Sequence, residues 1–469
     1  MSPALVVSAL AVVLAAPASP SPRTARFAAL EQVVRDELKA TGTPGAAVAV
    51  LHGGRVVYAR GFGVASVETG APVTPSTLFR LGSTTKMLTA AAMVVLAGQG
   101  RLRLDAPIGE RATGLAPAIG RRTAHQLLSN AAGVADFPAP RVSHDDDALA
   151  TTVRAFADDA VFAEPGQVYS YSSPGFWLAG YVLEQAGGKP YADMMEELVF
   201  APVGMRRTTL RPLAAMTHPL ALGHQLDGGR PVVIRPAFDN TAMWPAGSVF
   251  SSAEELARFV GALLAGGRVD GEQALPAGLF TALSGEYVEV PGEPGVHYGY
   301  GLLNFEQRGV RLVMHGGFSR GYGSMIQIAP AHGFAVVVLT NRSGETLPRT
   351  TARAQAMFLP LEPEPAPAPR PALPLAAEDL RRFAGVYVNG PQTWEIFARD
   401  GRLHLRADGS EVALTRTSEW RLSFGDALES DVAFVAGTGD RAEYVFTGMY
   451  AGRRRPDPAP PRDPATTGG

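Results

Sequence analysis

A proline-rich segment constrains the architecture of this chain more than any other feature. Residues 359–374 read LPLEPEPAPAPRPALP. Alternating prolines exclude a helix and the inside of a sheet, so this stretch predicts an extended linker of polyproline type. It separates a long segment, residues 23–358, from a short one, residues 375–453. We therefore expect one large domain followed by one small domain.

Strand-like stretches stand at both ends of the large segment, with helix-like stretches between them. Residues 46–63 (AAVAVLHGGRVVYARGFG) predict a hairpin that turns at Gly53-Gly54, where positive φ is tolerated. Residues 84–100, rich in Ala, Leu and Met, predict a helix ended by glycine. Residues 311–344 predict three strands joined by glycine-bearing loops. The pattern indicates an α+β domain, with one antiparallel sheet closed by the two ends of the segment and a helical insertion.

The short segment reads as a series of brief β-type runs. Turn residues, such as Asp400-Gly401 and Asp408-Gly409, separate several of them. This pattern predicts a small antiparallel barrel or sandwich. The last residues, 454–469, have almost no apolar side chains to bury, and we expect them to be disordered.

The N-terminus predicts export. An apolar run over residues 4–16 is followed by Ala16-Pro17-Ala18, which is typical of a signal peptide (1–18) cleaved after Ala18. The mature protein would then be secreted or periplasmic. No Lys or Arg precedes the run, which leaves an uncleaved membrane anchor as the alternative. Apolar runs long enough for a further membrane span are missing from the sequence, so we expect no integral membrane domain.

Composition excludes several kinds of site. The 469-residue chain has no cysteine, which removes disulfides, thiolate metal sites and a cysteine nucleophile. Its formal net charge of −2 disfavours a nucleic-acid partner. His218 and His224 are too loosely spaced, without a third ligand nearby, to indicate zinc. We expect a solvated loop there and no metal site.

Ser83 and Lys86 form the first candidate for chemistry. They lie where an extended segment meets the predicted helix, and positions i and i+3 of a helix share one face. A lysine held neutral by burial can take the proton of a serine hydroxyl, and a helix N-terminus stabilises developing negative charge. The alternative is an ordinary serine N-cap beside a solvent-facing lysine.

Two further candidates follow along the chain. Tyr171 lies on a loop before a predicted helix; near a lysine ammonium, its phenol would ionise more readily and serve as acid or base. Tyr169 competes for that role, and a half-packed surface tyrosine is the alternative. His315-Gly316-Gly317 follows a predicted strand, where a histidine can donate a hydrogen bond to a substrate carboxylate or oxyanion. Its alternative is a strand-end turn with an incidental histidine.

In this order, the three motifs resemble the serine β-lactamase and penicillin-binding-protein superfamily. The nearest branch contains class C β-lactamases, D-alanyl-D-alanine carboxypeptidases, D-aminopeptidases and esterases. Further segments carry the resemblance: TLFRLGSTTKMLTAAAM (77–93), TAHQLLSNAAGV (123–134), FAPVGMRRT (200–208) and AGSVFSSAEELARF (246–259). The resemblance implies a β-lactamase/transpeptidase-like fold. In the short segment, FAGVYVNG and TWEIFARDGRLHLRA resemble the lipocalin-like barrels appended to some relatives.

The resemblance also implies roles for residues. Ser83 would be the nucleophile, Lys86 its activating partner, and Tyr171 the group that exchanges protons with Ser83 and the leaving group. His315 would meet the substrate. After Gly317, the backbone N–H of Phe318 would form the oxyanion hole together with that of Ser83. The implied reaction is acylation of the serine followed by hydrolysis, without metal or organic cofactor.

Two departures from the family pattern bear on the substrate. Ser173 stands where the family has the Asn of Tyr-x-Asn, and its hydroxyl reaches less far. His315-Gly-Gly replaces the Lys-Thr-Gly of efficient β-lactamases, and neutral imidazole anchors a carboxylate less well than ammonium does. We therefore expect a serine hydrolase acting on a small-molecule ester or a D-amino-acid or peptide-like amide, with peptidoglycan as a further partner. The alternatives are a true class C-like β-lactamase and a catalytically weak cell-wall-binding or scaffold protein. Loops 138–147 and 285–296 would determine substrate choice.

Overall fold

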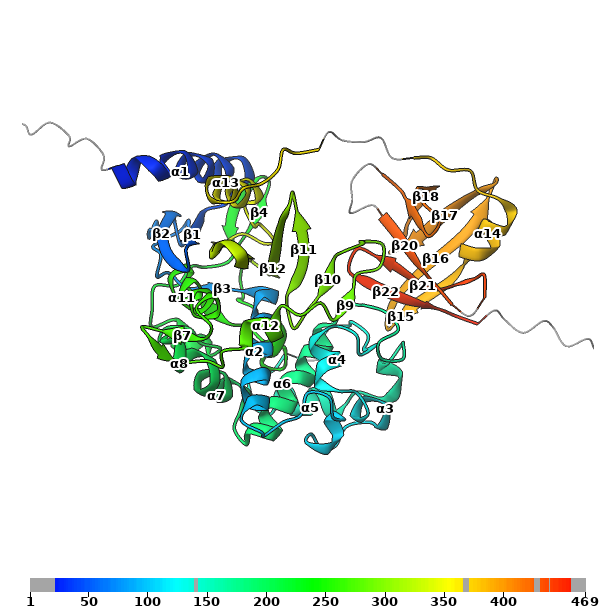
Figure 1. Ribbon diagram of the computed structural model, residues 1–469, viewed down its shortest axis with the longest axis horizontal. Coiled ribbons are helices and arrows are strands. Elements are labelled where there is room, and N and C mark those ends of the chain that lie inside the picture. The colour runs from blue at the N-terminus through cyan, green and yellow to red at the C-terminus, as the bar shows by residue number, and fades with distance from the viewer. Residues whose placement is uncertain (1–21, 139–141, 366–370, 426–430, 438, 457–469) are drawn as a thin grey trace, which may run out of the picture.

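The computed structural model describes residues 22–138, 142–365, 371–425, 431–437 and 439–456. The predicted signal peptide, 1–18, lies outside these residues, as does the predicted tail from residue 457 on. Figure 1 shows a large sheet-and-helix body with a barrel at one end of it. Within the described ranges, no helix is both long enough and apolar enough to cross a membrane.

An eight-stranded antiparallel sheet forms the centre of the large body, in the order β2-β1-β14-β13-β12-β11-β10-β9. Its strands are β1 (Gly45–His52), β2 (Arg55–Gly63), β9 (Val288–Glu289), β10 (His297–Tyr298), β11 (Leu303–Gln307), β12 (Val310–Ser319), β13 (Tyr322–Ala329) and β14 (Phe334–Thr340). Strand β1 pairs with β14, so that Ala46 lies opposite Thr340. The predicted sheet, closed by the two ends of the segment, is confirmed. Gly53 and Gly54 turn the first hairpin with φ of +59° and +71°, as a tight two-residue turn requires.

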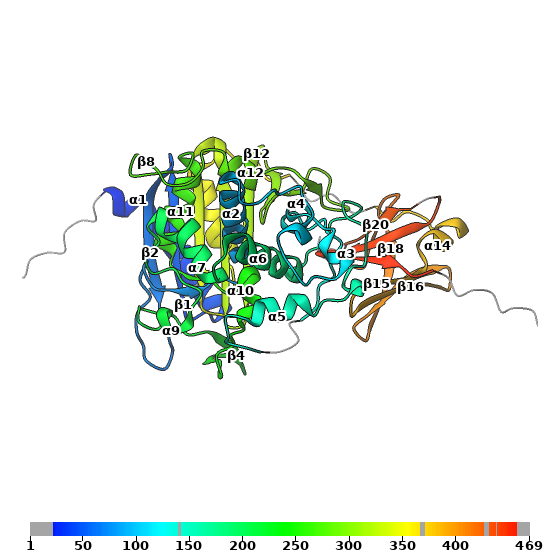
Figure 2. The same cartoon turned by 90° about the horizontal axis from the view of Figure 1, so that it is seen from below.

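Both faces of the sheet are covered, and β1 shows it residue by residue. Ala47 and Leu51 face the core shared with the helical insertion, whereas Ala46 and Val50 face a second core. This alternation follows from the two-residue period of a strand. Figure 2 shows α2 and α11 over the sheet, with α6 packed against α2. The opposite face carries α1 and α13, which pack together.

The helical insertion surrounds α2, which is buried along nearly its whole length. A helix that is apolar on all sides belongs inside a domain, which explains its Ala- and Leu-rich sequence. The helices are α1 (Pro22–Thr41), α2 (Thr85–Gly98), α3 (Pro117–Gly120), α4 (Ala124–Leu128), α5 (Ala148–Arg154), α6 (Ser173–Gly187), α7 (Tyr191–Met195), α8 (Ala201–Val203), α9 (Pro212–Ala215), α10 (Trp244–Gly247), α11 (Ala253–Leu264), α12 (Leu279–Leu283), α13 (Pro348–Phe358) and α14 (Ala377–Phe383). Short strand pairs are β3 (Phe79–Arg80) with β6 (Phe250–Ser251), β4 (His224–Asp227) with β5 (Arg230–Val233), and β7 (Arg268–Val269) with β8 (Glu272–Gln273).

The short segment closes into an eight-stranded antiparallel barrel, which confirms the predicted all-β unit. Its strands are β15 (Gly385–Asn389), β16 (Gln392–Arg399), β17 (Arg402–Ala407), β18 (Ser410–Arg416), β19 (Arg421–Ser423), β20 (Asp431–Ala436), β21 (Ala442–Thr447) and β22 (Tyr450–Arg454). The predicted turns Asp400-Gly401 and Asp408-Gly409 have positive φ throughout. Because β22 ends at Arg454, the predicted tail begins inside the last strand.

One expectation about the sheet is wrong. We placed His315-Gly316-Gly317 after a strand, but it lies inside β12, which continues to Ser319. The glycines serve a close approach rather than a strand end: a Cβ on Gly317 would lie 2.0 Å from the carbonyl oxygen of Leu81. Strand β12 thus passes directly against the segment that carries Ser83.

The barrel docks on the large body through a small polar centre. The buried Asn389 accepts a hydrogen bond from the Asp136 N–H (3.2 Å) and donates to Ser170 Oγ (3.1 Å) and the Ala451 carbonyl (2.7 Å). Around this centre, Tyr169 and Tyr298 of the large body pack with apolar barrel side chains. The two bodies therefore share one packed interface.

Asn389→Ala is expected to lower the free energy of unfolding by about 2 kcal/mol, because it leaves buried donors and acceptors without partners. Urea unfolding followed by tryptophan fluorescence measures this change. Arg402→Ala, at an exposed barrel position, is the matched control and should change stability by less than about 0.5 kcal/mol. Equal stability of the two variants would show that the polar centre does not hold the domains together.

Candidate functional site

Ser83 and Lys86 meet at the start of α2. Ser83 lies in a single 3-10 turn, Gly82–Thr84, between β3 and the helix. The Lys86 side chain is fully buried, and its Nζ lies 3.3 Å from Ser83 Oγ, 3.4 Å from Ser173 Oγ and 2.9 Å from the Ala246 carbonyl oxygen. These three acceptors match the three protons of an ammonium group. The solvent-facing lysine considered as an alternative is thus not what the structure shows.

Burial determines the charge state of Lys86. Removal from water lowers the pKa of its amine from 10.5 to about 7, and the carboxylate of Asp136 opposes that shift. Near neutral pH, a large fraction of the molecules therefore carries a neutral amine next to the Ser83 hydroxyl. A neutral amine in this place can accept the serine proton.

Tyr171 completes the contact set of Ser83. Its hydroxyl is hydrogen-bonded to Ser83, and Lys86 Nζ lies 4.6 Å from the centre of its ring. We expected the lysine to make this phenol ionise more readily, but burial raises its pKa well above 10.0. Tyr171 therefore stays protonated and can pass a proton only while exchanging it with a partner. The competing Tyr169 packs instead between the rings of Tyr298 and Phe446, at 5.4 and 5.9 Å between centroids.

His315 is buried and uncharged. Burial, with a smaller effect of Lys86, lowers its pKa to about 3. Nδ1 lies 2.5 Å from the Gly316 carbonyl oxygen, which can only accept, so Nδ1 carries the proton. Nε2 then accepts from the Tyr298 hydroxyl at 3.1 Å. Because both ring nitrogens have partners within the protein, His315 presents no positive charge to a substrate, unlike the lysine of Lys-Thr-Gly.

Strand β12 brings Phe318 next to the turn of Ser83. Gly82 has φ of +56°, and a Cβ there would lie 2.4 Å from the Phe318 carbonyl oxygen and 2.8 Å from its nitrogen. Only glycine allows two backbones so close. Backbone amides of Ser83 and Phe318 thus come from neighbouring segments, as an oxyanion hole requires. The Phe318 side chain is 67% exposed.

Sequence reasoning missed Asp136 and Tyr450. The Ser173 N–H donates to Asp136 Oδ1 at 2.8 Å, and the Tyr450 hydroxyl donates to the same carboxylate. Burial raises the pKa of Asp136, while the bonds from Ser173 and Tyr450 and the charge of Lys86 lower it. Asp136 follows the recognisable segment 123–134 closely, so its position could have been noticed. Tyr450 belongs to the barrel, and no sequence pattern connects it to this site.

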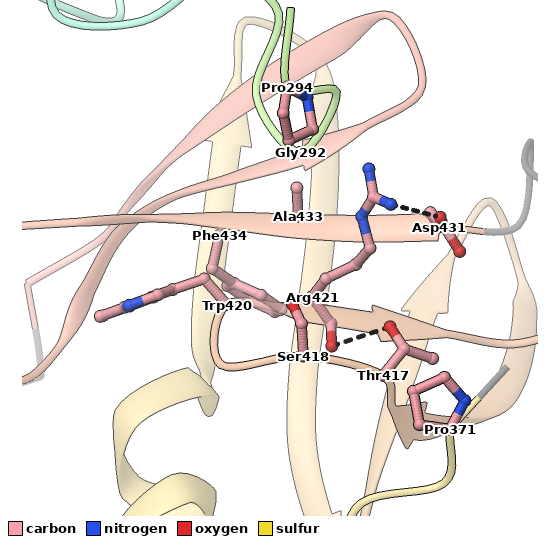
Figure 3. A pocket seen from close by; sticks show the side chains of 10 residues that line it. All are labelled: Gly292, Pro294, Pro371, Thr417, Ser418, Trp420, Arg421, Asp431, Ala433 and Phe434. Carbon is pink, nitrogen blue, oxygen red and sulfur yellow. Dashed lines mark hydrogen bonds and ion pairs between the residues drawn. The ribbon is translucent and has the colours of Figure 1, made fainter.

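The hollows at the seam between the two bodies do not contain this centre. Figure 3 shows one of about 420 Å³, with Gly292 and Pro294 of the large body above barrel residues such as Trp420 and Arg421. Another, of about 580 Å³, is lined by residues that include Tyr169 and Tyr287. Their linings lack a nucleophile paired with a base. The predicted specificity loop 285–296 forms part of both walls, so it lies against the barrel.

The histidines proposed for a solvated loop differ from each other. His218 is partly buried, but His224 is fully buried, with Nδ1 3.0 Å from the Asn341 carbonyl oxygen and Nε2 accepting from the Val67 N–H. The expectation of solvation is therefore wrong for His224, which links β4 to the end of β14. In the part of the chain that the structure covers, no group of His, Asp or Glu could hold a metal ion.

Comparison with known proteins identifies the family. The Beta-lactamase family model matches residues 30–359, which include β1, the Ser83 turn, Tyr171 and all of β12. The chain belongs to the beta-lactamase family. The chain is thus a member of the β-lactamase/transpeptidase-like superfamily, whose members are serine hydrolases and penicillin-binding proteins.

Relatives of this β-lactamase-family chain include bacterial proteins of two kinds. Protein flp of Staphylococcus aureus (strain MW2) is 25% identical over 329 residues, 68% of this chain and 64% of that protein. Penicillin-binding protein 4 of Amycolatopsis lactamdurans is 29% identical over 308 residues, 64% of this chain and 81% of that protein. The chain thus aligns with less than two thirds of protein flp. The solved structure of SurE with D-Leu is 26% identical, has a TM-score of 0.76 and covers 92% of this chain and 100% of that one. That coverage extends beyond residue 359, into the barrel.

The reaction of Ser83 is expected to accelerate with pH. A neutral Lys86 amine is the reactive form, so the rate should rise through a pKa of about 7 and level off above it. Labelling of Ser83 by a fluorophosphonate probe, timed between pH 5 and 9, measures this profile. Lys86→Arg keeps the positive charge at every pH and should label at least about 100-fold more slowly. A flat profile for the native protein would contradict the assignment of Lys86 as the base.

The same buried lysine should lower stability in a pH-dependent way. Its folded pKa of about 7 lies below the ordinary 10.5, so between these values the unfolded chain binds a proton that the folded chain lacks. Stability from this group is therefore lost as pH falls from 10.5 to 7 and is constant below 7. Lys86→Met removes this dependence. As the pH falls from 9.5 to 7, the free energy of unfolding of Lys86→Met should therefore rise relative to that of the native protein. Urea unfolding at both pH values tests this, with the exposed Lys189→Met as a control that should show no such change.

Proposed function

We propose that this protein is an exported serine hydrolase that forms an acyl-enzyme on Ser83. The observation that carries the proposal is the Ser83–Lys86 pair, in which a buried amine with a pKa of about 7 lies 3.3 Å from the hydroxyl oxygen. Export rests on the signal-like sequence of residues 1–18. Family membership supports hydrolase chemistry in general. The acyl-enzyme on Ser83 and the export of the protein are our proposal.

The geometry supports the following steps. Neutral Lys86 takes the Ser83 proton while Oγ attacks the substrate carbonyl, and the backbone amides of Ser83 and Phe318 hold the resulting oxyanion. The hydroxyl of Tyr171 gives its proton to the leaving alcohol or amine and is reprotonated from the Lys86 ammonium. The C–O or C–N bond breaks, which leaves the acyl group on Ser83. Water, deprotonated by the same groups, then adds to the acyl carbon and releases the acid.

We infer that the substrate is an ester or a D-amino-acid or peptide-like amide. The 26% identical SurE structure contains D-Leu, which supports a D-amino-acid group. Neutral His315 and the short Ser173 side chain weaken the capture of a β-lactam carboxylate, so β-lactams rank below esters. Peptidoglycan is the natural source of D-amino-acid amides outside the cell and is our proposed partner surface.

A true class C-like β-lactamase is the alternative enzyme, and a catalytically weak cell-wall-binding or scaffold protein is the non-enzymatic one. The scaffold reading conflicts with the contacts of Ser83, because a buried, desolvated lysine is costly to keep without a use. The β-lactamase reading makes a separate prediction: a chromogenic cephalosporin should then turn over at a rate that rivals the best ester.

Hydrolysis of p-nitrophenyl butyrate by the purified protein and by Ser83→Ala tests the nucleophile. The variant should lose about 10⁶-fold in kcat, the scale seen when a catalytic serine is removed. Ser76→Ala, at a nearby turn on the surface, is the control and should keep full activity. Retained activity in Ser83→Ala would overturn the assignment. In parallel, D- and L-alanine p-nitroanilides and the cephalosporin rank the substrate classes, and we expect ester above D-amide above cephalosporin.

A further inference from the structure

We propose that the barrel takes part in catalysis: the Tyr450 hydroxyl positions the Asp136 carboxylate, which in turn holds the Ser173 end of the Lys86 hydrogen-bond set. This proposal rests on the proposed function, because it assumes that Lys86 activates Ser83. It assigns positioning roles to Asp136 and Tyr450, which do not touch the reacting atoms.

The contacts form one continuous path from the barrel to the nucleophile. Tyr450, the first residue of β22, donates its hydroxyl to Asp136. Asp136 accepts from the Ser173 N–H at 2.8 Å, and Ser173 Oγ lies 3.4 Å from Lys86 Nζ. Lys86 Nζ lies 3.3 Å from Ser83 Oγ.

The barrel fixes the same region from a second direction. The Asp136 N–H donates to Asn389 Oδ1 at 3.2 Å, so the barrel holds both the backbone and the side chain of this residue. The Tyr171 N–H donates to the Met449 carbonyl oxygen at 3.0 Å. Met449 and Tyr450 are neighbours at the β21–β22 turn, and a single turn thus contacts the backbone of Tyr171 and the carboxylate of Asp136.

Asp136 also supports the Lys86 amine, which the short side chain of Ser173 does less well. The family residue at position 173 is an asparagine, whose amide reaches the lysine and the substrate. The shorter Ser173 hydroxyl leaves the lysine with less support, and a carboxylate behind it compensates by favouring the protonated amine. The other titratable groups around this pair in the described chain are uncharged: burial keeps Tyr171, Tyr169, Tyr298 and Tyr450 protonated and His315 neutral. The charge of Asp136 therefore acts on Lys86 without a nearby competitor.

Three variants test the proposal, each timed by fluorophosphonate labelling between pH 5 and 9. Tyr450→Phe removes one hydroxyl and keeps the ring, Asp136→Asn removes the charge and keeps an acceptor, and the third variant combines both changes. Tyr444→Phe is the matched control, because this barrel hydroxyl also donates across the interface, to Gln167, but not to the site. Thermal melts confirm that each variant is folded. The probe needs no knowledge of the natural substrate.

A positioning role predicts a shift of the pH profile. Without the charge of Asp136, the pKa of Lys86 falls, so the ascending limb of the Asp136→Asn profile moves to lower pH. Its plateau falls about tenfold, because a weaker base takes the proton. Loss of the Tyr450 hydrogen bond raises the pKa of Asp136 and so reduces its negative charge. Tyr450→Phe should therefore also move the ascending limb to lower pH and lower the plateau. The double variant should match Asp136→Asn, and Tyr444→Phe should match the native protein.

Each result of these labelling experiments tests a different part of the proposal. If Tyr450→Phe keeps the native limb and plateau, or loses rate without any shift of the limb, Tyr450 is structural only and the proposal is wrong. Additive effects in the double variant would show that Tyr450 does not act through Asp136. If the native protein is not labelled at Ser83 at any pH, the proposed function fails and this inference fails with it.

Discussion

The burial of one amino group organises the catalytic part of the molecule. Lys86 is fully buried and yet has polar partners at each of its three donor positions. A desolvated amine demands such partners, because an unsatisfied one would cost several kcal/mol. Three separate segments therefore have to converge on it: the Ser83 turn, the start of α6 and the carbonyl of Ala246. A fourth segment, β12, passes close to Gly82 and so lies beside the Ser83 turn.

The barrel belongs to this arrangement rather than to the periphery. Its β21–β22 turn meets the loop of Tyr171, and Asn389 binds Ser170 of that loop and the backbone of Asp136 in another segment. Two domains that a proline-rich linker separates in sequence thus share one interface, and the site lies at its inner edge.

Local patterns predicted those parts of the structure that local physics determines. The Gly53-Gly54 turn, the helix after Ser83 and the short barrel strands follow from backbone conformation and side-chain period, and the structure has them all. Contacts between segments distant in sequence were not predictable in this way. No sequence pattern near Tyr450 predicts Asp136 as its partner. The glycines after His315 are as typical of a turn as of a close approach between two backbone segments. The same limit applies to Tyr171, whose neighbour Lys86 suggested easy ionisation until its depth in the fold was known.

The pairing of β1 with β14 also has a consequence for how the chain acquires its structure. Ala46 and Thr340 lie opposite each other, separated by roughly 300 residues of chain. At typical rates of synthesis, the apolar strand β1 waits about 15 to 60 s before its partner has been made. During that interval, its unpaired edge is available for wrong associations. The edge of β1 that pairs with β14 therefore stays open until almost three quarters of the polypeptide exists.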